Sequence, residues 1–155
     1  MNVMRVMAVD YGDVRTGLAV SDLTNTLAGD VLVVREADPG RLAERLVMEA
    51  RERGVSRIVV GHPRNMNGSP GPRAQKSESL AECLRALSGL PVALWDERRT
   101  SVDARRALHT AGRHGKKNKA MEDAVAAAII LEGYLAYLAS HGHTAMHTTG
   151  NPTSI

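Results

Sequence analysis

Hydrophobic residues along this chain occur in short blocks whose spacing changes from strand-like to helical. The first block, Val3–Val9, is apolar at nearly every position, which predicts a strand buried on both faces. Gly17–Ser21 and Asp30–Arg35 predict two further strands, joined by a polar connection. The first part of the chain is therefore predicted to form a meander of strands.

Helical and strand-like blocks alternate in the rest of the chain. The predicted elements are, in order, a helix from Pro39 to about Arg53, a strand Arg57–Val60, a helix at about Ala74–Ser88, a strand Val92–Trp95, a helix capped by Thr100 or Ser101, and a helix from about Ala120 to Ala139. A meander followed by β-α units predicts an α/β fold with a five-stranded mixed sheet flanked by helices. In such sheets, sites form at the carboxyl ends of the strands.

The length of the chain limits its organisation. A chain of 155 residues is long enough for one domain with a proper core, predicted over residues 1–140. Residues 141–155 are polar and contain Gly and Pro, which predicts a disordered C-terminal tail. His141, His143 and His147 lie in this tail, and a metal site there would lack the periodic structure needed to hold it.

The ends and the cysteine content exclude several classes of protein. The N-terminus shows no basic-then-apolar leader, and no apolar run is expected to reach the length of a membrane span. The single cysteine, Cys83, excludes an internal disulfide framework, and no Cys/His spacing is typical of a zinc site. We therefore expect a cytoplasmic protein with no membrane partner.

Basic residues are concentrated in one segment. The net charge is only +3, but residues 98–119 carry eight lysines and arginines against one acid, Asp103. Taken alone, such a run is typical of a solvated helix and loop. The segment begins next to Glu97 and ends just before Asp123, which favours a surface that faces phosphates. Because aromatic residues are scarce, nucleic acid would be bound through its backbone and shape rather than by base stacking.

Three carboxylates lie next to apolar blocks, where burying an acid costs free energy unless it is paired or bound to a metal. Asp10 ends the first apolar block, Glu97 follows the last predicted strand, and Asp123 opens an apolar, Ala-rich stretch. Each alone has an ordinary explanation, as a turn residue, a surface residue or a charge at a helix N-terminus. Together they predict an oxygen-rich site for Mg²⁺ or Mn²⁺. Two such ions about 4 Å apart would suit phosphodiester hydrolysis.

The first turn allows two other interpretations. Gly12 and Gly17 are spaced as in a P-loop, but the next two residues are not the Lys-Ser/Thr pair that a P-loop needs, so this interpretation fails. The turn after Asp10 also looks like the phosphate-binding turn of actin-like and sugar-kinase ATPases. Those enzymes close two domains over the nucleotide, whereas this chain has room for one.

Several blocks, in their order along the chain, identify a family. They are Met7–Gly12 with Arg15 and Gly17, Gly61–Ser69, Asp96–Arg98 with Thr100, and Asp123 followed by Ala126, Ala127 and Ile129–Leu131. Over nearly everything from Met4 to Leu138, the chain resembles the YqgF family of RNase H-like nucleases, which are described as Holliday-junction-resolvase-like proteins and pre-16S rRNA nucleases. The resemblance implies an RNase H-like fold and a metal-dependent nuclease.

The resemblance also implies site residues. Asp10, Glu97 and Asp123 would be the catalytic acids and would bind the metal. Together with the charge pattern, it leads us to expect substrate contacts from Arg15, Asn65, Ser69, Arg98, Thr100, Arg113, Lys116, Lys117 and Lys119. No histidine is assigned as a general base.

The loop Gly61–Ser69 departs from the family pattern, which usually has Leu before and after the Pro and Asp before the Gly. Here these positions are His62, Arg64 and Asn67. The changes do not affect the three acids, but they leave the identity of the substrate undecided. A ribosomal RNA precursor is the first expectation. The alternatives are a DNA-junction resolvase with the same site, which a dimer with two active sites would favour, and a non-cleaving nucleic-acid-binding factor in transcription or ribosome maturation. The sequence fits a monomer or a homodimer.

Overall fold

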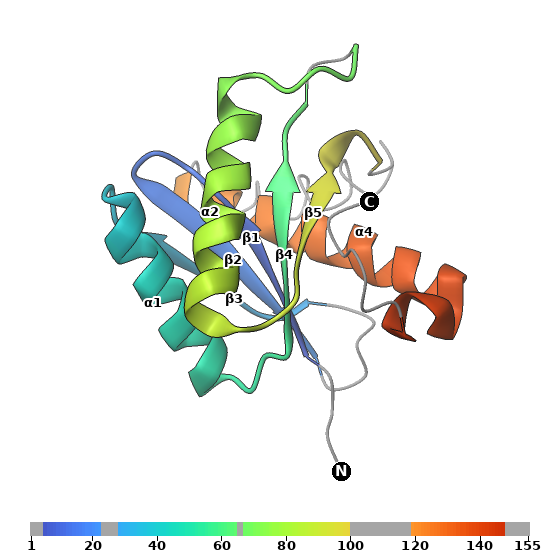
Figure 1. Ribbon diagram of the computed structural model, residues 1–155. Coiled ribbons are helices and arrows are strands. Elements are labelled where there is room, and N and C mark those ends of the chain that lie inside the picture. Colours follow the sequence, from blue (N-terminus) through green and yellow to red (C-terminus); the bar gives the residue numbers. More distant parts are fainter. Residues whose placement is uncertain (1–4, 23–27, 65–66, 100–118, 148–155) are drawn as a thin grey trace.

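The computed structural model describes residues 5–22, 28–64, 67–99 and 119–147. Its strands are β1 (Val6–Asp10), β2 (Arg15–Ser21), β3 (Ala28–Arg35), β4 (Arg57–His62) and β5 (Val92–Asp96). They form one sheet in the order β3-β2-β1-β4-β5 (Figure 1). The pairs β1–β2 and β2–β3 are antiparallel, whereas β4 runs parallel to β1 and to β5. The predicted five-stranded mixed sheet is confirmed.

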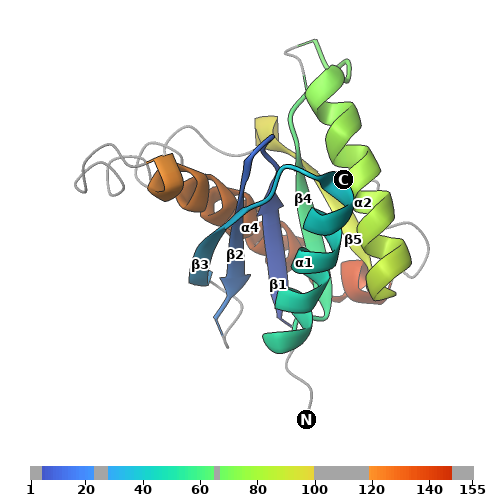
Figure 2. The same cartoon turned by 90° about the vertical axis from the view of Figure 1, so that its left-hand side faces the viewer.

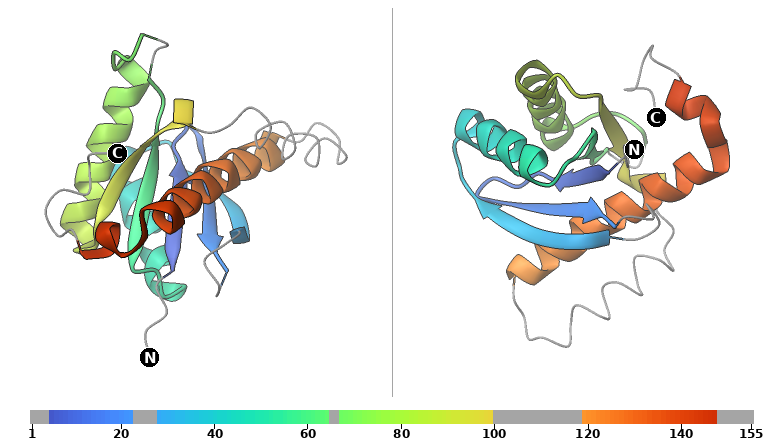
Figure 3. Two further views of the ribbon diagram at one scale, coloured as in Figure 1. Left: turned by 90° about the vertical axis from the view of Figure 1, so that its right-hand side faces the viewer. Right: turned by 90° about the horizontal axis from the view of Figure 1, so that it is seen from below.

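Helices cover both faces of this sheet. Helices α1 (Pro39–Glu52) and α2 (Pro72–Ser88) lie on one face, and the long helix α4 (Lys119–His147) crosses the other, as Figures 2 and 3 show. A short 3-10 helix, η1 (Glu97–Arg99), follows β5 directly. The described chain therefore has three layers, with the sheet in the middle.

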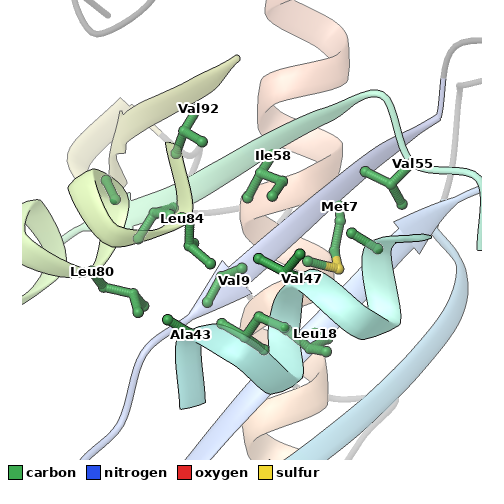
Figure 4. Packing of buried hydrophobic residues seen from close by; sticks show 14 of the residues in the cluster. Met7, Val9, Leu18, Ala43, Val47, Val55, Ile58, Leu80, Leu84 and Val92 are labelled. Atoms are coloured by element: carbon green, nitrogen blue, oxygen red, sulfur yellow. The ribbon is translucent and has the colours of Figure 1, made fainter. Parts of the chain in front are cut away.

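Alternation along β1 divides the core into two parts. Met7 and Val9 pack with the residues under α1 and α2 (Figure 4), whereas Val6 and Ala8 pack with the residues under α4. Successive side chains of a strand point to opposite faces of the sheet. Asp10 continues the alternation of Val6 and Ala8, so its carboxylate belongs to the face that α4 covers.

Local signals explain where α1 and α2 begin and end. Asp38 caps α1 by accepting a hydrogen bond from the backbone N–H of Arg41 at 2.9 Å, and a proline occupies the first turn of each helix. Gly54 and Gly89 follow the two helices with φ angles of +69° and +73°, which glycine adopts without steric cost.

Helix α4 is longer than the sequence pattern predicts. The helix was predicted to end at Ala139, with a disordered tail from His141, but it continues to His147. Residues 141–147 therefore belong to the helix in this structure. The ring of His141 lies 4.0 Å from that of Tyr137, and its Nδ1 lies 2.9 Å from the Tyr137 carbonyl oxygen. These contacts, one helical turn apart, are typical of a helix that continues at least to His141. Residues 148–155 and the helix predicted after Thr100 lie outside the described residues.

The stretch Glu122–His141 of α4 is also more apolar than expected. By length and composition alone it could cross a membrane, with a mean hydropathy of 1.4, so the expectation that no apolar run reaches this length is wrong. In the structure its apolar side chains cover the sheet. Ala127, Ile130, Leu131 and Tyr134 are buried there.

Candidate active site

The three-acid site (Asp10, Glu97 and Asp123) is assembled at the carboxyl ends of the parallel strands β1, β4 and β5. Asp10 is the last residue of β1 and lies opposite Gly17 of β2. Glu97 follows β5 as the first residue of η1. Asp123 lies near the start of α4, on the face of the sheet toward which Asp10 points. All three side chains are partly buried.

Electrostatic coupling shows that the three acids share one neighbourhood. Burial, followed by the negative charges of Glu97 and Asp123, raises the pKa of Asp10 from 3.8 to about 7, while the charge of Arg73 opposes this rise. Near neutral pH, Asp10 therefore takes up a proton unless a cation compensates the two neighbouring carboxylates. Arg73 has no signal in the sequence, because it comes near Asp10 only through the position of α2.

Two glycines allow the acids to approach the sheet. A Cβ atom on Gly17 of β2 would overlap the backbone carbonyl oxygen of Asp123. A Cβ atom on Gly61 of β4 would lie 2.7 Å from Oε2 of Glu97 and 2.6 Å from Cδ1 of Ile130. Since real Cβ atoms do not come so close to other heavy atoms, any larger residue at either position would displace an acid.

Arg15 is paired with one of the acids. Its Nε donates a hydrogen bond to Oδ2 of Asp123 at 2.9 Å, and both side chains are largely shielded from solvent. The sequence resemblance predicted a substrate contact for Arg15. The structure places it within the site, where its charge partly neutralises Asp123.

The chemistry of these side chains fits a hard divalent cation. Carboxylate oxygens are the ligands that Mg²⁺ and Mn²⁺ prefer, and a cation would relieve the crowding of negative charge at Asp10. Among the residues that the structure describes, however, no three Asp, Glu, His or Cys side chains lie close enough together to bind one ion. Ion binding at this site therefore requires some adjustment of the carboxylates.

The other residues that were predicted to contact the substrate lie in different surroundings. Arg98 is exposed and donates hydrogen bonds to Asp96, with its Nη2 at 2.6 Å from Oδ2 and its Nε at 3.0 Å from Oδ1. These hydrogen bonds chiefly hold the pKa of Asp96 below its usual range. Ser69 is exposed and donates through its hydroxyl to Oδ1 of Asn67 at 2.7 Å. Asn65, Thr100, Arg113, Lys116 and Lys117, together with the side chain of Lys119, lie outside the described residues.

A cation–π clamp holds the turn that carries Glu97. The guanidinium carbon of Arg99 lies 5.0 Å from the ring centroid of Trp95 and 4.8 Å from that of Tyr137. It links η1 to the end of β5 and to α4. Sequence reasoning missed this role of Arg99, because Tyr137 is distant in sequence and the basic run around Arg99 is typical of a solvated surface.

A pocket of about 640 Å³ lies on the other side of the sheet. Its lining includes Tyr11, Pro39, Pro72, Lys76 and Cys83. Tyr11 packs with the core under α1 and α2, whereas Asp10, the residue before it, faces α4. The pocket is therefore separated by β1 from the three-acid site.

Comparisons with known proteins agree with this architecture. A family model described as RuvX, Holliday junction resolvase, matches residues 4–137. Over 135 residues, 87% of this chain and 94% of the other, the chain is 43% identical to a Desulfitobacterium hafniense (strain DSM 10664 / DCB-2) protein named "Putative pre-16S rRNA nuclease". A protein of the same name from Pelotomaculum thermopropionicum is 42% identical over 134 residues, 85% of this chain and 86% of that one.

Among solved structures, the chain is similar to T. thermophilus RuvC in complex with Holliday junction substrate. The TM-score is 0.60 at 16% sequence identity, and the match covers 86% of this chain and 96% of that one. A likeness at this identity concerns the fold. It confirms the predicted RNase H-like architecture, a mixed five-stranded sheet between helices.

Proposed function

We propose that this protein, which belongs to the RuvX family and is a nuclease, cleaves phosphodiester bonds in the precursor of 16S rRNA. Asp10, Glu97 and Asp123 are its proposed catalytic acids. The family match confirms the resemblance to YqgF nucleases found in the sequence. One observation carries the assignment of the site. Gly17, the partner of Asp10 in the sheet, lies against the backbone of Asp123, and Gly61 on the neighbouring strand β4 lies against the carboxylate of Glu97, so the three acids meet at one place. In agreement with this geometry, burial and then the negative charges of Glu97 and Asp123 raise the pKa of Asp10 to about 7.

In this proposal the three acids would bind two divalent ions, either Mg²⁺ or Mn²⁺. When bound, such ions activate a water molecule for attack on the phosphorus and stabilise the leaving 3′ oxygen. The protein contributes the placement of its carboxylates. Asp10 is fixed by the central strand, Glu97 by the turn that Arg99 clamps, and Asp123 by its ion pair with Arg15.

Cations around the site would hold the nucleic acid. Arg73 acts on Asp10, and Arg98 lies directly after Glu97. The basic segment 98–119 joins η1 to α4 in the sequence, so it leads from Glu97 toward Asp123. Its charge favours contact with phosphates on either side of the bond to be cleaved. A cytoplasmic place of action follows from a ribosomal RNA substrate.

The description of the matching family favours a second substrate, branched DNA. The same carboxylates would then cleave a four-way junction, and two copies of the site would be needed for paired cuts. A homodimer of this chain would supply them, whereas a monomer suits the RNA substrate.

The decisive experiment compares cleavage of a precursor 16S rRNA fragment and of a four-way DNA junction, each with Mg²⁺ and with Mn²⁺. We expect cleavage of the RNA by the wild-type protein and none by Asp10→Asn, Glu97→Gln or Asp123→Asn. Asp30→Asn is the matched control, because Asp30 is ion-paired with Arg53 away from the site. Cleavage of the junction alone would establish the second substrate, and a triple acid variant as active as wild type would overturn the assignment of the site.

A further inference from the structure

A buried histidine connects α2 to the loop that follows β4. His62, the last residue of β4, is only 4% exposed. Its Nε2 lies 2.7 Å from Oε2 of Glu78 on α2, and its Nδ1 accepts a hydrogen bond from Nε of Arg64 at 3.2 Å. The three side chains therefore form a continuous hydrogen-bonded chain from the helix to the loop.

The partners of His62 define its protonation. The Nε of Arg64 is a donor only, so Nδ1 of His62 accepts and carries no hydrogen. In the neutral ring the hydrogen then lies on Nε2, which donates it to the carboxylate of Glu78. Turning the ring over would put Cδ2 against Arg64 and Cε1 against Glu78, so both hydrogen bonds would be lost. The imidazole is thus locked, and the guanidinium of Arg64 is held in one orientation.

Arg64 lies at the same edge of the sheet as the acids. Gly61, next to His62 on β4, is the residue against which Oε2 of Glu97 packs. The charge of Arg64 also contributes to lowering the pKa of Asp96, after the larger effect of the Arg98 hydrogen bond. The guanidinium therefore stands beside the residues that lead into η1.

Much of this guanidinium remains available for a ligand. The side chain of Arg64 is exposed, and besides Nε it uses only Nη1, which is 3.4 Å from the carbonyl oxygen of Gly68. In the described part of the chain, its other N–H groups have no hydrogen-bond partner. A fixed guanidinium with free donors suits a phosphate, because the planar fork matches two oxygens at once.

We propose that Arg64, oriented by His62 and Glu78, binds a backbone phosphate of the nucleic-acid strand that passes the three-acid site. The proposal rests on the nuclease function proposed above. Three carboxylates repel a polyanion, and a cation held rigidly at their rim offsets that repulsion.

The first test measures binding without cleavage. In an Asp10→Asn background, the affinity for a labelled precursor rRNA fragment and for a four-way DNA junction is measured by fluorescence anisotropy over a salt series. We expect Arg64→Ala to weaken binding of both about tenfold at about 0.1 M salt and to reduce the salt slope by about one unit. Arg41→Ala is the matched control, since Arg41 is an exposed arginine on α1. It should leave both quantities unchanged.

The second test separates orientation from folding. His62→Asn keeps an acceptor near the position of Nδ1, and His62→Gln keeps a donor near the position of Nε2. We expect His62→Asn, which loses the contact with Glu78 but keeps an acceptor for Arg64, to bind more weakly than the parent and more tightly than His62→Gln. His62→Gln should bind like Arg64→Ala, and both variants should melt as cooperatively as the parent. If the two variants bind alike, or if Arg64→Ala has an unchanged salt slope, the proposal is overturned.

Failure of the nuclease proposal gives a different result. If the wild-type protein cleaves neither substrate while Arg64→Ala still loses one unit of salt slope, the catalytic assignment fails and the phosphate contact stands. If the wild-type protein cleaves and Arg64→Ala binds as tightly as its parent, the contact is refuted and the catalytic assignment stands.

Discussion

Arg15 donates a hydrogen bond from Nε to Oδ2 of Asp123 at 2.9 Å, although the two residues are 108 positions apart in the sequence. The bond joins the start of β2 to the first turns of α4. It fixes the carboxylate that comes from the most distant part of the chain. Together with the charge of Arg73 near Asp10, it offsets part of the negative charge that the three acids bring together.

We expect Arg15→Ala to lower the free energy of unfolding by about 1 kcal/mol at low salt, because the ion pair is only partly exposed. The loss should become smaller at high salt, as screening weakens the pair. Urea unfolding of the variant at two ionic strengths measures both effects. Arg41→Ala removes a far more exposed ion pair and should change little; a salt-independent loss in Arg15→Ala would argue for packing instead of charge.

The raised pKa of Asp10 predicts a pH-dependent stability in the absence of divalent metal. The folded protein holds the Asp10 proton with a pKa of about 7, against 3.8 ordinarily. The resulting stabilisation is fully present below about pH 4 and is lost as the pH rises toward 7. In EDTA, Asp10→Asn should therefore melt several degrees above wild type at pH 8, with a smaller difference at pH 5.

The control for this measurement is Asp13→Asn, which removes a largely exposed carboxylate. Its melting temperature relative to wild type should not change in the same way with pH. Mn²⁺ should raise the melting temperature of wild type at pH 8, because a ligand of the folded state stabilises it. An equal shift in the Asp10→Asn/Asp123→Asn variant would mean that the ion binds elsewhere.

Gly17→Ala should be strongly destabilising for a single methyl group. The new Cβ would overlap the backbone carbonyl oxygen of Asp123, and a backbone atom cannot move aside as a flexible side chain can. We expect a loss of about 1–3 kcal/mol in urea unfolding, together with weaker Mn²⁺ binding. In Gly40→Ala, by contrast, the nearest atom to the new Cβ is 3.4 Å away, in the first turn of α1. This control should be neutral or slightly stabilising.

The clamp around Arg99 should control the position of Glu97. Arg99→Ala removes contacts with both Trp95 and Tyr137 and should cost about 1–2 kcal/mol of stability. It should also weaken Mn²⁺ binding, because η1 loses its attachment to α4. Arg99→Lys keeps a cation over the rings and should restore part of both losses. Calorimetric titration with Mn²⁺ that gives one affinity for all three proteins would contradict this role.

The basic segment should govern affinity more than chemistry. Replacing Arg113, Lys116, Lys117 and Lys119 by Ala should weaken RNA and DNA binding alike, with each lost phosphate contact reducing the salt slope by about one unit. The single-turnover rate at saturating substrate should change little, since the three acids are untouched. Filter binding over a salt series, paired with single-turnover cleavage, measures both. If the salt slope of the quadruple variant is unchanged, the segment does not contact phosphates and is only a solvated surface.

Local patterns account for much of the agreement between sequence and structure. Apolar blocks of about five residues cannot be buried except as strands or helices, so the five strands, the helices α1 and α2 and the start of α4 were predictable within a few residues. The order of β-β-β followed by β-α units likewise implied a mixed sheet. The three acids were recognisable because a carboxylate at the end of an apolar block is unfavourable without a partner.

The long-range contacts could not be predicted in this way. Nothing in the periodicity of β2 or α4 indicates that Arg15 meets Asp123, or that Gly17 is small because a helix backbone crosses it. The same is true of the bond between His62 and Glu78, since each residue alone is typical of an ordinary loop or helix surface.

By itself, the sequence determined which segments become strands and helices, and that acids stand at the carboxyl ends of β1 and β5. Only the tertiary structure decided the strand order, which places β1 between β2 and β4 and so brings Asp10 beside Gly17. The physical reason is that propensity, capping and alternation act over a few residues. The pKa of Asp10, by contrast, depends on burial and on charges that the folded chain brings in from Glu97 and Asp123.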